Sequence, residues 1–405
     1  MLAETRHALF FNRTLFAIVL LAGLYFPSSY NEGWSATLTR LSFIVSMIFL
    51  IWLALRTGVR KQICLWISSA IVIWLCFCTF LSLFSSLHEI TLSPLTLFPP
   101  IAFLFSIKVI DFRAENLTRI LAMISTANVC MAIAMLTSES FQGFMASYYN
   151  NFSSDLIMEM VGANKPVLTF ATHSLAGVFV YVFFWLNFRT YQKTGKRLHL
   201  LLAVLHVVMC IAIMSITSLA FSLAAIVELA WNFKWLSAIS AASAYFLIPL
   251  SMKETIGDAL SAAVWRREGG GFLVRYFDAH GSLANAFAYI HNHPFLPMGL
   301  MYSHDLFDEG AQTDSGPVSY FLRGSIVLVL LMYGGFFLFL RRNLLNKWDC
   351  YRLFLVVCLT ELGAVVLVYP RSFLLIPAFI IYLNSVPVAS SAQVKSLQPI
   401  ATPVN

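Results

Sequence analysis

The sequence predicts an all-α protein that crosses a membrane many times. Of its 405 residues, 59% are hydrophobic and only 11% are charged, whereas roughly a quarter of the residues in a soluble domain are charged. The apolar residues recur in separate runs of helical length, and the mean hydropathy is +0.79. This pattern is typical of helices that cross a bilayer, and it excludes a soluble enzyme, a disulfide-rich scaffold and a coiled coil.

The apolar runs predict about twelve transmembrane helices, within a range of about ten to twelve. The spans are expected to begin near residues 14, 38, 65, 92, 119, 166, 198, 217, 235, 317, 353 and 371. Two places leave the total open. Residues 198–232 must hold two short spans joined at Ser215 to Ser218, and the last two spans are expected to meet tightly at Tyr369 to Ser372.

The distribution of Lys and Arg predicts that both termini lie in the cytoplasm. In this orientation most of the 26 basic residues fall on the cytoplasmic side, as the positive-inside rule requires. The formal net charge of +7 is then explained by membrane orientation, and a nucleic-acid-binding surface is not predicted. The 7 cysteines fall in spans or at cytoplasmic ends, where none is placed to form an external disulfide.

Two segments interrupt the pattern of short loops, and both are expected to face outward. The smaller, 138–165, combines aromatic and acidic residues in a way that suits the membrane interface. The larger, 251–316, contains the amphipathic run FLVRYFDAHGSLANAFAYI. The chain is therefore expected to divide into transmembrane helices and the smaller segment at 1–250, the large external loop at 251–316, further transmembrane helices at 317–386, and a disordered cytoplasmic tail at 387–405.

Three arginines at the external mouth of the helices are candidates for binding a pyrophosphate. Arg275 lies in the amphipathic run, Arg323 lies just inside the tenth span, and Arg371 lies between the last two spans. Arginine near hydrocarbon is costly, so it is normally paired or used, and planar guanidinium groups suit a pyrophosphate. The structural alternative is snorkelling to lipid headgroups, or pairing with Glu361 or Asp314.

Acidic and histidine residues on the same side complete the candidate site. Asp314, in the run TDSGPVSYFLRG, could take a proton from a sugar hydroxyl, although capping of the following helix is the alternative role for it. His173 lies in the external half of the sixth span, where it either forms a structural hydrogen bond or lines a cavity. His293 precedes Pro294 and is expected to shape a turn. No metal site is predicted, because the spacing is too loose among His291, His293, His304 and Asp305.

Three stretches together resemble the bacterial O-antigen polymerase and O-antigen ligase superfamily. They are FATHSLAGVFVYVFFW, RYFDAHGSLANAFAYIHNHPFLPMGL and DSGPVSYFLRGSIVLVLLMYGG. The expected number of spans, the cytoplasmic termini and the long late periplasmic loop also agree. Polymerases of this superfamily often carry Asp where its ligases carry an essential His, so Asp314 favours a polymerase. One departure is Leu219, which stands where many members have an arginine; Arg371 or Arg323 is the candidate replacement.

The resemblance implies a membrane-embedded, GT-C-like glycosyltransferase of the bacterial inner membrane that needs no metal or other cofactor. It would polymerise undecaprenyl-pyrophosphate-linked oligosaccharide repeat units at the periplasmic face, to make an O-antigen, a capsule or an exopolysaccharide. The catalytic residues would be Arg275 and Asp314, and the residues that bind pyrophosphate or glycan would be Arg371, Arg323, His173 and His293. Besides the lipid bilayer, a chain-length regulator and a flippase of the same pathway are implied partners, and nucleic acid is not.

Three alternatives stay open at this point. The first is an O-antigen ligase, which would transfer finished glycan to lipid A core from the same donor. The second is a transporter or flippase of lipid-linked sugars, a class that often shows internal repeats and charges deep in the bundle. The third is a structural partner in an envelope assembly complex, in which the arginines and Asp314 would be dispensable.

Overall fold

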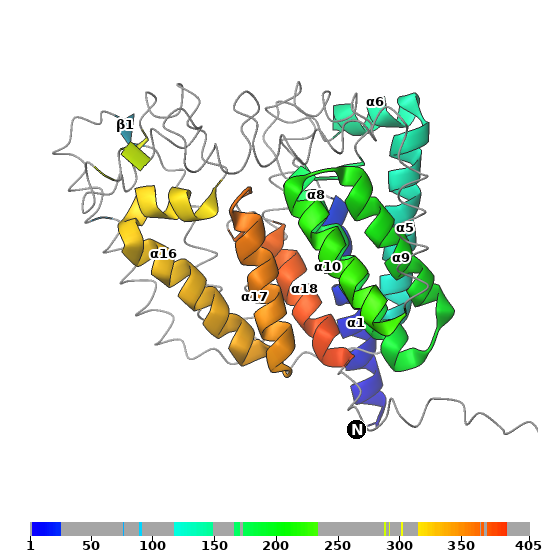
Figure 1. The fold of residues 1–405 in the computed structure, drawn as a ribbon. Helices are drawn as coiled ribbons and strands as arrows, with labels where there is room; N and C mark the ends of the chain where they lie inside the picture. Colours follow the sequence, from blue (N-terminus) through cyan, green and yellow to red (C-terminus); the bar gives the residue numbers. More distant parts are fainter. Residues whose placement is uncertain are drawn as a thin grey trace, which may run out of the picture.

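The computed structural model describes residues 2–25, 117–148, 166–170, 173–233, 315–364 and 371–386, with short pieces at 76, 89–90, 287–288, 291, 301–302 and 366–367. In these parts the chain forms a bundle whose long helices run between two ends (Figure 1). We call the end of the bundle that holds the N-terminus and Arg197 the inner end. The opposite end, which holds His173 and Arg371, is called the outer end.

The first helices are α1 (Leu2–Tyr25), α5 (Leu117–Thr137) and α6 (Glu139–Tyr148). α6 turns away from α5 and lies across the outer end (Figure 1). Ser138 makes this turn possible, because its hydroxyl accepts a hydrogen bond from the Phe141 N–H at 3.3 Å and so caps the new helix. α6 falls inside the segment 138–165, which the sequence predicts to face outward.

Three antiparallel helices follow: α8 (His173–Thr194), α9 (Arg197–Ile213) and α10 (Ile216–Asn232). Gly195 has a φ of +67°, which lets the chain reverse between α8 and α9. Ser215 and Ser218 form a reciprocal capping box at the start of α10. The prediction of two short helices within 198–232 is confirmed, but the joint lies at Met214 and Ser215, and Ser218 belongs to the second helix.

The last helices are α16 (Gly316–Asn343), α17 (Lys347–Glu361) and α18 (Ser372–Ser385). α16 begins with Ser315 at the N-cap position and Pro317 in its first turn, a common arrangement at helix starts. The predicted tight junction at residues 369–372 is wrong, because α17 already ends at Glu361 and α18 begins only at Ser372. The ten-position connection between them is stabilised by the Glu361 side chain, as described below.

A two-stranded pairing is the one departure from an all-α chain among the described residues. β1 (Glu89–Ile90) and β2 (Met301–Tyr302) run antiparallel, with Glu89 opposite Tyr302. β2 belongs to the predicted large loop, and the pairing lies on the outer-end side of the bundle (Figure 1). The short pairing therefore ties one part of that loop to a distant part of the chain.

α8 lies at the centre of the described bundle. Its side chains are buried continuously from Ser174 to Thr190, and it contacts α5, α9, α10, α17 and α18. A helix that is apolar on all sides is buried either by neighbouring helices or by lipid. Gly177 allows a close approach to α10, because a Cβ atom there would lie 2.6 Å from the Cβ of Ser218.

Two described helical segments are long and apolar enough to cross a membrane: Leu117–Thr137 and Ile326–Asn343. Shorter apolar helices cover Asn12–Tyr25, Arg197–Ile213, Thr217–Asn232 and Leu374–Ser385. Apart from residue 76, the spans predicted to begin near residues 38, 65, 92 and 235 lie outside the described residues, as does the tail at 387–405. The structure therefore shows a helical bundle with membrane-compatible helices, for only part of the predicted architecture.

Candidate functional site

The structure places three of the six candidate site residues at or toward the outer end of the bundle. His173 is the first residue of α8, Arg323 lies in the first half of α16, and Arg371 immediately precedes α18. The other three candidates, Arg275, His293 and Asp314, lie outside the described residues. Ser315, the sequence neighbour of Asp314, is buried and occupies the N-cap position of α16, a role that the sequence analysis considered for Asp314.

Arg371 is almost completely buried, with 2% of its surface exposed. Its Nη1 donates to the backbone oxygen of Leu24 at 3.1 Å and to the hydroxyl of Thr169 at 3.0 Å. The Thr169 hydroxyl in turn donates to the same Leu24 oxygen, and the Phe170 ring lies 5.2 Å from the guanidinium carbon. Arg371 therefore joins the end of α1, the 166–170 turn and the start of α18.

Glu361 is the second charged side chain buried at the outer end, with 0% exposure. Its Oε1 accepts hydrogen bonds from the backbone N–H groups of Val366 and Leu367, each at 2.6 Å. Its carboxylate also accepts from the Tyr320 hydroxyl at 3.1 Å and the Tyr333 hydroxyl at 2.9 Å. The bonds to Val366 and Leu367 replace helical partners and let α17 end early. They also show that Glu361 is held by other groups than Arg371, against one of the expected pairings.

The first turns of α8 and α10 bring hydroxyl groups to the same end. A Cβ atom at Gly363 would lie 3.6 Å from Ser174 Oγ and 3.8 Å from Thr217 Oγ1, so the turn after α17 passes close to both helix starts. His173, next to Ser174, is half-buried at this end. The outer end thus gathers a guanidinium, a carboxylate, an imidazole and several hydroxyls from separate helices.

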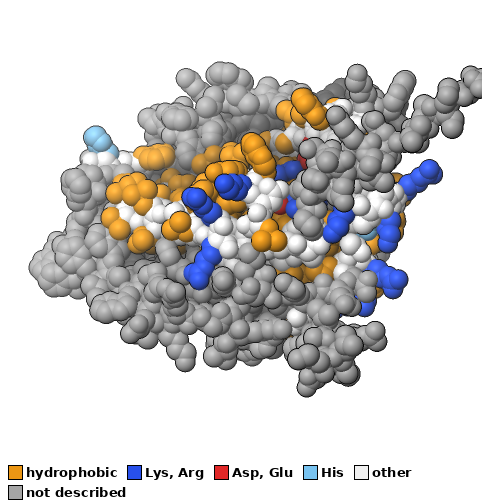
Figure 2. All heavy atoms as spheres, turned by 90° about the horizontal axis from the view of Figure 1, so that it is seen from below, with side chains coloured by type: hydrophobic (Ala, Val, Ile, Leu, Met, Phe, Trp, Pro, Cys, Tyr) orange, Lys and Arg blue, Asp and Glu red, His pale blue; other side chains and the backbone are white. Residues whose placement is uncertain are grey.

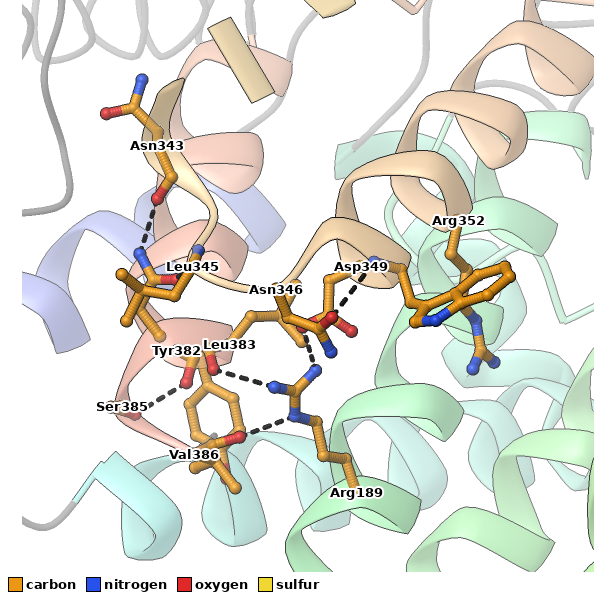
Figure 3. Close-up of polar contacts among 12 residues, drawn as sticks. Arg189, Asn343, Leu345, Asn346, Asp349, Arg352, Tyr382, Leu383, Ser385 and Val386 are labelled. Carbon is orange, nitrogen blue, oxygen red and sulfur yellow. Dashed lines mark hydrogen bonds and ion pairs between the residues drawn. The ribbon is translucent and has the colours of Figure 1, made fainter. Parts of the chain in front are cut away.

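The inner end is organised differently, by ion pairs. Arg189 of α8 pairs with Asp349 of α17 and also donates to the backbone oxygens of Val386 at 2.6 Å and Leu383 at 3.3 Å (Figure 3). Both partners are buried, with side-chain exposures of 5% and 8%. Lys193 donates to the last turn of α18 as well, at 3.3 Å. These bonds satisfy carbonyl groups that a helix end leaves without partners.

A second ion pair links α10 and α17 toward the inner end. Arg352 contacts Glu228 through both guanidinium Nη atoms, at 3.0 and 2.6 Å. The same guanidinium donates to the Tyr181 hydroxyl at 2.9 Å and lies 4.4 Å from the centre of the Trp185 ring. This pair is less buried than the first, with side-chain exposures of 25% and 27%.

Basic side chains gather on the surface of the inner end, which Figure 2 shows from below. The exposed lysines and arginines whose side chains the structure describes all lie at this end: Arg119, Lys193, Lys196, Arg197, Arg341, Arg342 and Lys347. The two charged residues described above at the outer end, Arg371 and Glu361, are buried. Among the described residues, exposed positive charge therefore lies at the inner end only.

Sequence reasoning missed part of this site. Phe170 begins the quoted run FATHSLAGVFVYVFFW and Thr169 directly precedes it, but nothing in this stretch indicates that they contact an arginine some two hundred positions away. Glu361 was considered only as a partner for the three candidate arginines. The sequence nevertheless indicates that Glu361 is unusual, because an acidic residue inside an apolar run is expected to have a dedicated partner. Comparisons of the chain with family models, with curated proteins and with solved structures find no match.

Proposed function

We propose that this protein is a membrane glycosyltransferase that polymerises undecaprenyl-pyrophosphate-linked oligosaccharide repeat units. The observation that carries the proposal is the burial of Arg371 and Glu361 at the outer end of an apolar bundle. Ionisable groups inside membrane bundles are costly, and by default they mark a functional site. The order of the quoted motifs supports the same activity, because two of them, around His173 and Ser315, begin helices at this end.

The surface of the described bundle supports placement in a membrane. Large apolar side chains are exposed on its helices, among them Leu201, Leu223, Leu330, Leu338 and Leu355, and lipid would cover them. Trp231 and Trp348 are 90% and 80% exposed near the inner end, where aromatic residues are enriched at membrane interfaces. We infer a multi-pass protein of the bacterial inner membrane, with the basic inner end and both termini in the cytoplasm and the outer end in the periplasm.

In this proposal the basic residues of the outer end act at two levels. Arg275 of the periplasmic loop contacts the donor pyrophosphate directly, because a guanidinium offers several N–H donors to phosphate oxygens. Arg371 is too deeply buried to touch a substrate in this conformation. It orders the 166–170 turn beside His173 and adds positive potential beneath an anionic donor. Arg323 and His293 complete the group that binds pyrophosphate or glycan.

The proposed reaction is a single displacement at the anomeric carbon of the donor sugar. A hydroxyl oxygen of the acceptor repeat unit attacks this carbon from the face opposite the pyrophosphate and forms the new glycosidic bond. The bond from the anomeric carbon to the pyrophosphate oxygen breaks, and undecaprenyl pyrophosphate leaves with that electron pair. Asp314 takes the proton of the acceptor hydroxyl. The anomeric configuration inverts, and neither a metal nor a nucleotide is needed.

Glycan extension by the purified protein tests this activity. The protein, in nanodiscs with an undecaprenyl-pyrophosphate-linked repeat unit and a chelator, is expected to produce a ladder of lipid-linked oligomers. Arg275→Ala and Asp314→Asn should abolish the ladder. Arg342→Ala is the matched control, since it removes an exposed arginine at the inner end and should leave extension unchanged.

The products distinguish the alternatives. Transfer of glycan to lipid A core without a ladder would make the protein an O-antigen ligase. If neither product forms with the cognate repeat unit, the polymerase proposal fails, and a transporter of lipid-linked sugars or an assembly partner takes its place. A ladder that survives both substitutions would retain the activity but reject the assigned residues.

Thiol accessibility in cells tests the orientation separately. In a variant without the 7 native cysteines, Gly143→Cys in α6 should react with a membrane-impermeant thiol reagent added from outside the inner membrane. Lys193→Cys, which is exposed at the inner end, should react only after the membrane is opened. The reverse result would invert the proposed topology.

A further inference from the structure

The contacts of two tyrosines show that α16 is not a straight helix. Tyr320 and Tyr333 are thirteen positions apart in the sequence, a spacing that covers about 20 Å along a straight α-helix. Their ring centres nevertheless lie 6.0 Å apart, in an edge-to-face contact. Both hydroxyls reach the carboxylate of Glu361. α16 must therefore bend around this carboxylate.

Figure 1 shows the two parts of the bent helix. The first turns of α16 lie across the outer end of the bundle, and the remainder descends toward the inner end, where α17 begins. A Gly-Ser pair is a common site of helix bending, and α16 contains one at Gly324 and Ser325. The Glu361 side chain occupies the inside of this bend and binds both arms of it.

The start of α16 also lies directly on Glu361. A Cβ atom at Gly316 would overlap Oε2 and would lie 2.6 Å from Cδ of that side chain. Only glycine fits this position without moving either the helix or the carboxylate. By contrast, a Cβ atom at Gly334, on the descending arm of the same helix, would have nothing within 4 Å.

Glu361 connects this helix start to a second functional segment. Its Oε1 accepts hydrogen bonds from the backbone N–H groups of Val366 and Leu367. These two residues precede Arg371 by only five and four positions. Asp314 in turn precedes Gly316 by two positions. One buried carboxylate therefore binds the two segments that lead to the proposed base and to the buried arginine.

We propose that Glu361 is a positioning residue of the transferase: it holds the first turns of α16 across the outer end, so that Asp314 is set relative to the donor. This inference rests on the proposed function, and Glu361 itself contacts no substrate. Its role depends on accepting hydrogen bonds at a fixed place. Glutamine can keep this role, because its Oε1 accepts from both backbone N–H groups and its amide can donate to a tyrosine hydroxyl.

The first experiment measures extension rates of full-length variants in nanodiscs, normalised to folded protein. Glu361→Ala and Gly316→Ala should each lower the rate at saturating donor by about a hundredfold, since a misplacement of about 1 Å is enough for such a loss. The KM for the lipid-linked donor should stay unchanged. Glu361→Gln and the matched control Gly334→Ala should keep the wild-type rate.

These variants separate positioning from the other roles that Glu361 could have. If Glu361 only stabilised the bundle, the rate per folded molecule would be the same in all four variants. If its charge took part in the reaction, Glu361→Gln would be as slow as Glu361→Ala. If it contacted the donor, the KM would rise. Each of these results would overturn the proposal.

A distance measurement tests the bend without any activity. In a variant without native cysteines, spin labels at Phe321 in the first turns of α16 and at the exposed Ala220 in the first half of α10 report the position of the bent arm. Glu361→Ala and Gly316→Ala should shift or broaden the label-to-label distance, and Glu361→Gln and Gly334→Ala should not. An unchanged distance in Glu361→Ala would refute the positioning role, even if no polymer forms. A changed distance in a protein that makes no polymer would reject the polymerase alone.

Discussion

The two ends of the bundle hold their buried charges in different ways. At the inner end Arg189 and Asp349 pair with each other and join three helices. At the outer end Glu361 accepts four hydrogen bonds from neutral donors, and the hydrogen bonds that the structure gives for Arg371 go to neutral acceptors. A buried pair is costly to break, because removing one partner leaves an unpaired charge in the interior. We infer that the buried charges of the inner end hold the helices together, while those of the outer end position the candidate site.

The largest effect on stability is expected at the inner end. Arg189→Ala leaves Asp349 buried without its partner, which should lower the free energy of unfolding by about 3–5 kcal/mol. It also removes the donor to the backbone oxygens of Leu383 and Val386 at the end of α18. Denaturant titration of the purified protein in detergent measures the loss, and the extension rate per folded molecule should stay at the wild-type level.

The double variant Arg189→Ala/Asp349→Ala provides the control for this prediction. It removes both charges and should be more stable than Arg189→Ala alone, because no unpaired carboxylate remains. Equal stability of the single and double variants would mean that the ion pair does not hold the inner end together. A slower extension rate per folded molecule would contradict the proposal that the inner end affects stability and the outer end affects activity.

A smaller effect is expected from one hydrogen bond at the outer end. Tyr333→Phe removes a donor from the buried Glu361 carboxylate, and a hydrogen bond to a charged group contributes about 1.5–3 kcal/mol to stability. The same denaturant titration measures this loss. Tyr351→Phe is the matched control, because Tyr351 is 54% exposed and its substitution should change stability by less than about 0.5 kcal/mol.

Tyr333→Phe also sharpens the comparison through activity. It weakens one arm of the bend in α16 while it leaves Arg371 and the quoted motifs intact. We therefore expect it to slow extension per folded molecule, in contrast to Arg189→Ala, which costs more stability. A variant with normal extension but lowered stability would place Glu361 with the structural charges of the inner end.

Local signals in the sequence account for the parts of the fold that were predicted correctly. The joint between α9 and α10 follows from serines that cap a helix start, and the start of α16 follows from the Ser-Gly-Pro run beside Asp314. Both signals act over a few positions, so they can be recognised without knowing the fold. The error at the joint, from Ser215–Ser218 to Met214–Ser215, is of the size expected for element boundaries.

The rest depends on partners that are distant in the chain. The bend in α16 requires Glu361 to meet Tyr320, 41 positions away. The burial of Arg371 requires the Leu24 carbonyl, 347 positions away. No local pattern encodes such contacts, so the sequence could mark these residues as unusual charges but could not say which groups they bind.

A weaker coupling is expected for the second ion pair, between Arg352 and Glu228. Both side chains are about a quarter exposed, and partly exposed pairs contribute on the order of 1 kcal/mol or less. A double-mutant cycle with Arg352→Gln and Glu228→Gln, followed by denaturant titration, measures this coupling. A coupling as large as that of Arg189 and Asp349 would show that both pairs close the inner end equally.

The smallest effect on stability is expected at the aromatic surface of the inner end. Trp348 is 80% exposed at the start of α17, so Trp348→Phe should change the free energy of unfolding by less than about 0.5 kcal/mol. The difference in fluorescence between the wild type and Trp348→Phe gives the signal of Trp348 itself. If this end lies at the membrane interface, lipids labelled near the headgroup should quench that signal more than lipids labelled deep in the chain. Stronger quenching by the deep label would place the start of α17 inside the hydrocarbon. Quenching only by water-soluble acrylamide would show that the start of α17 lies outside the membrane, which would contradict the proposed inner boundary of the bundle.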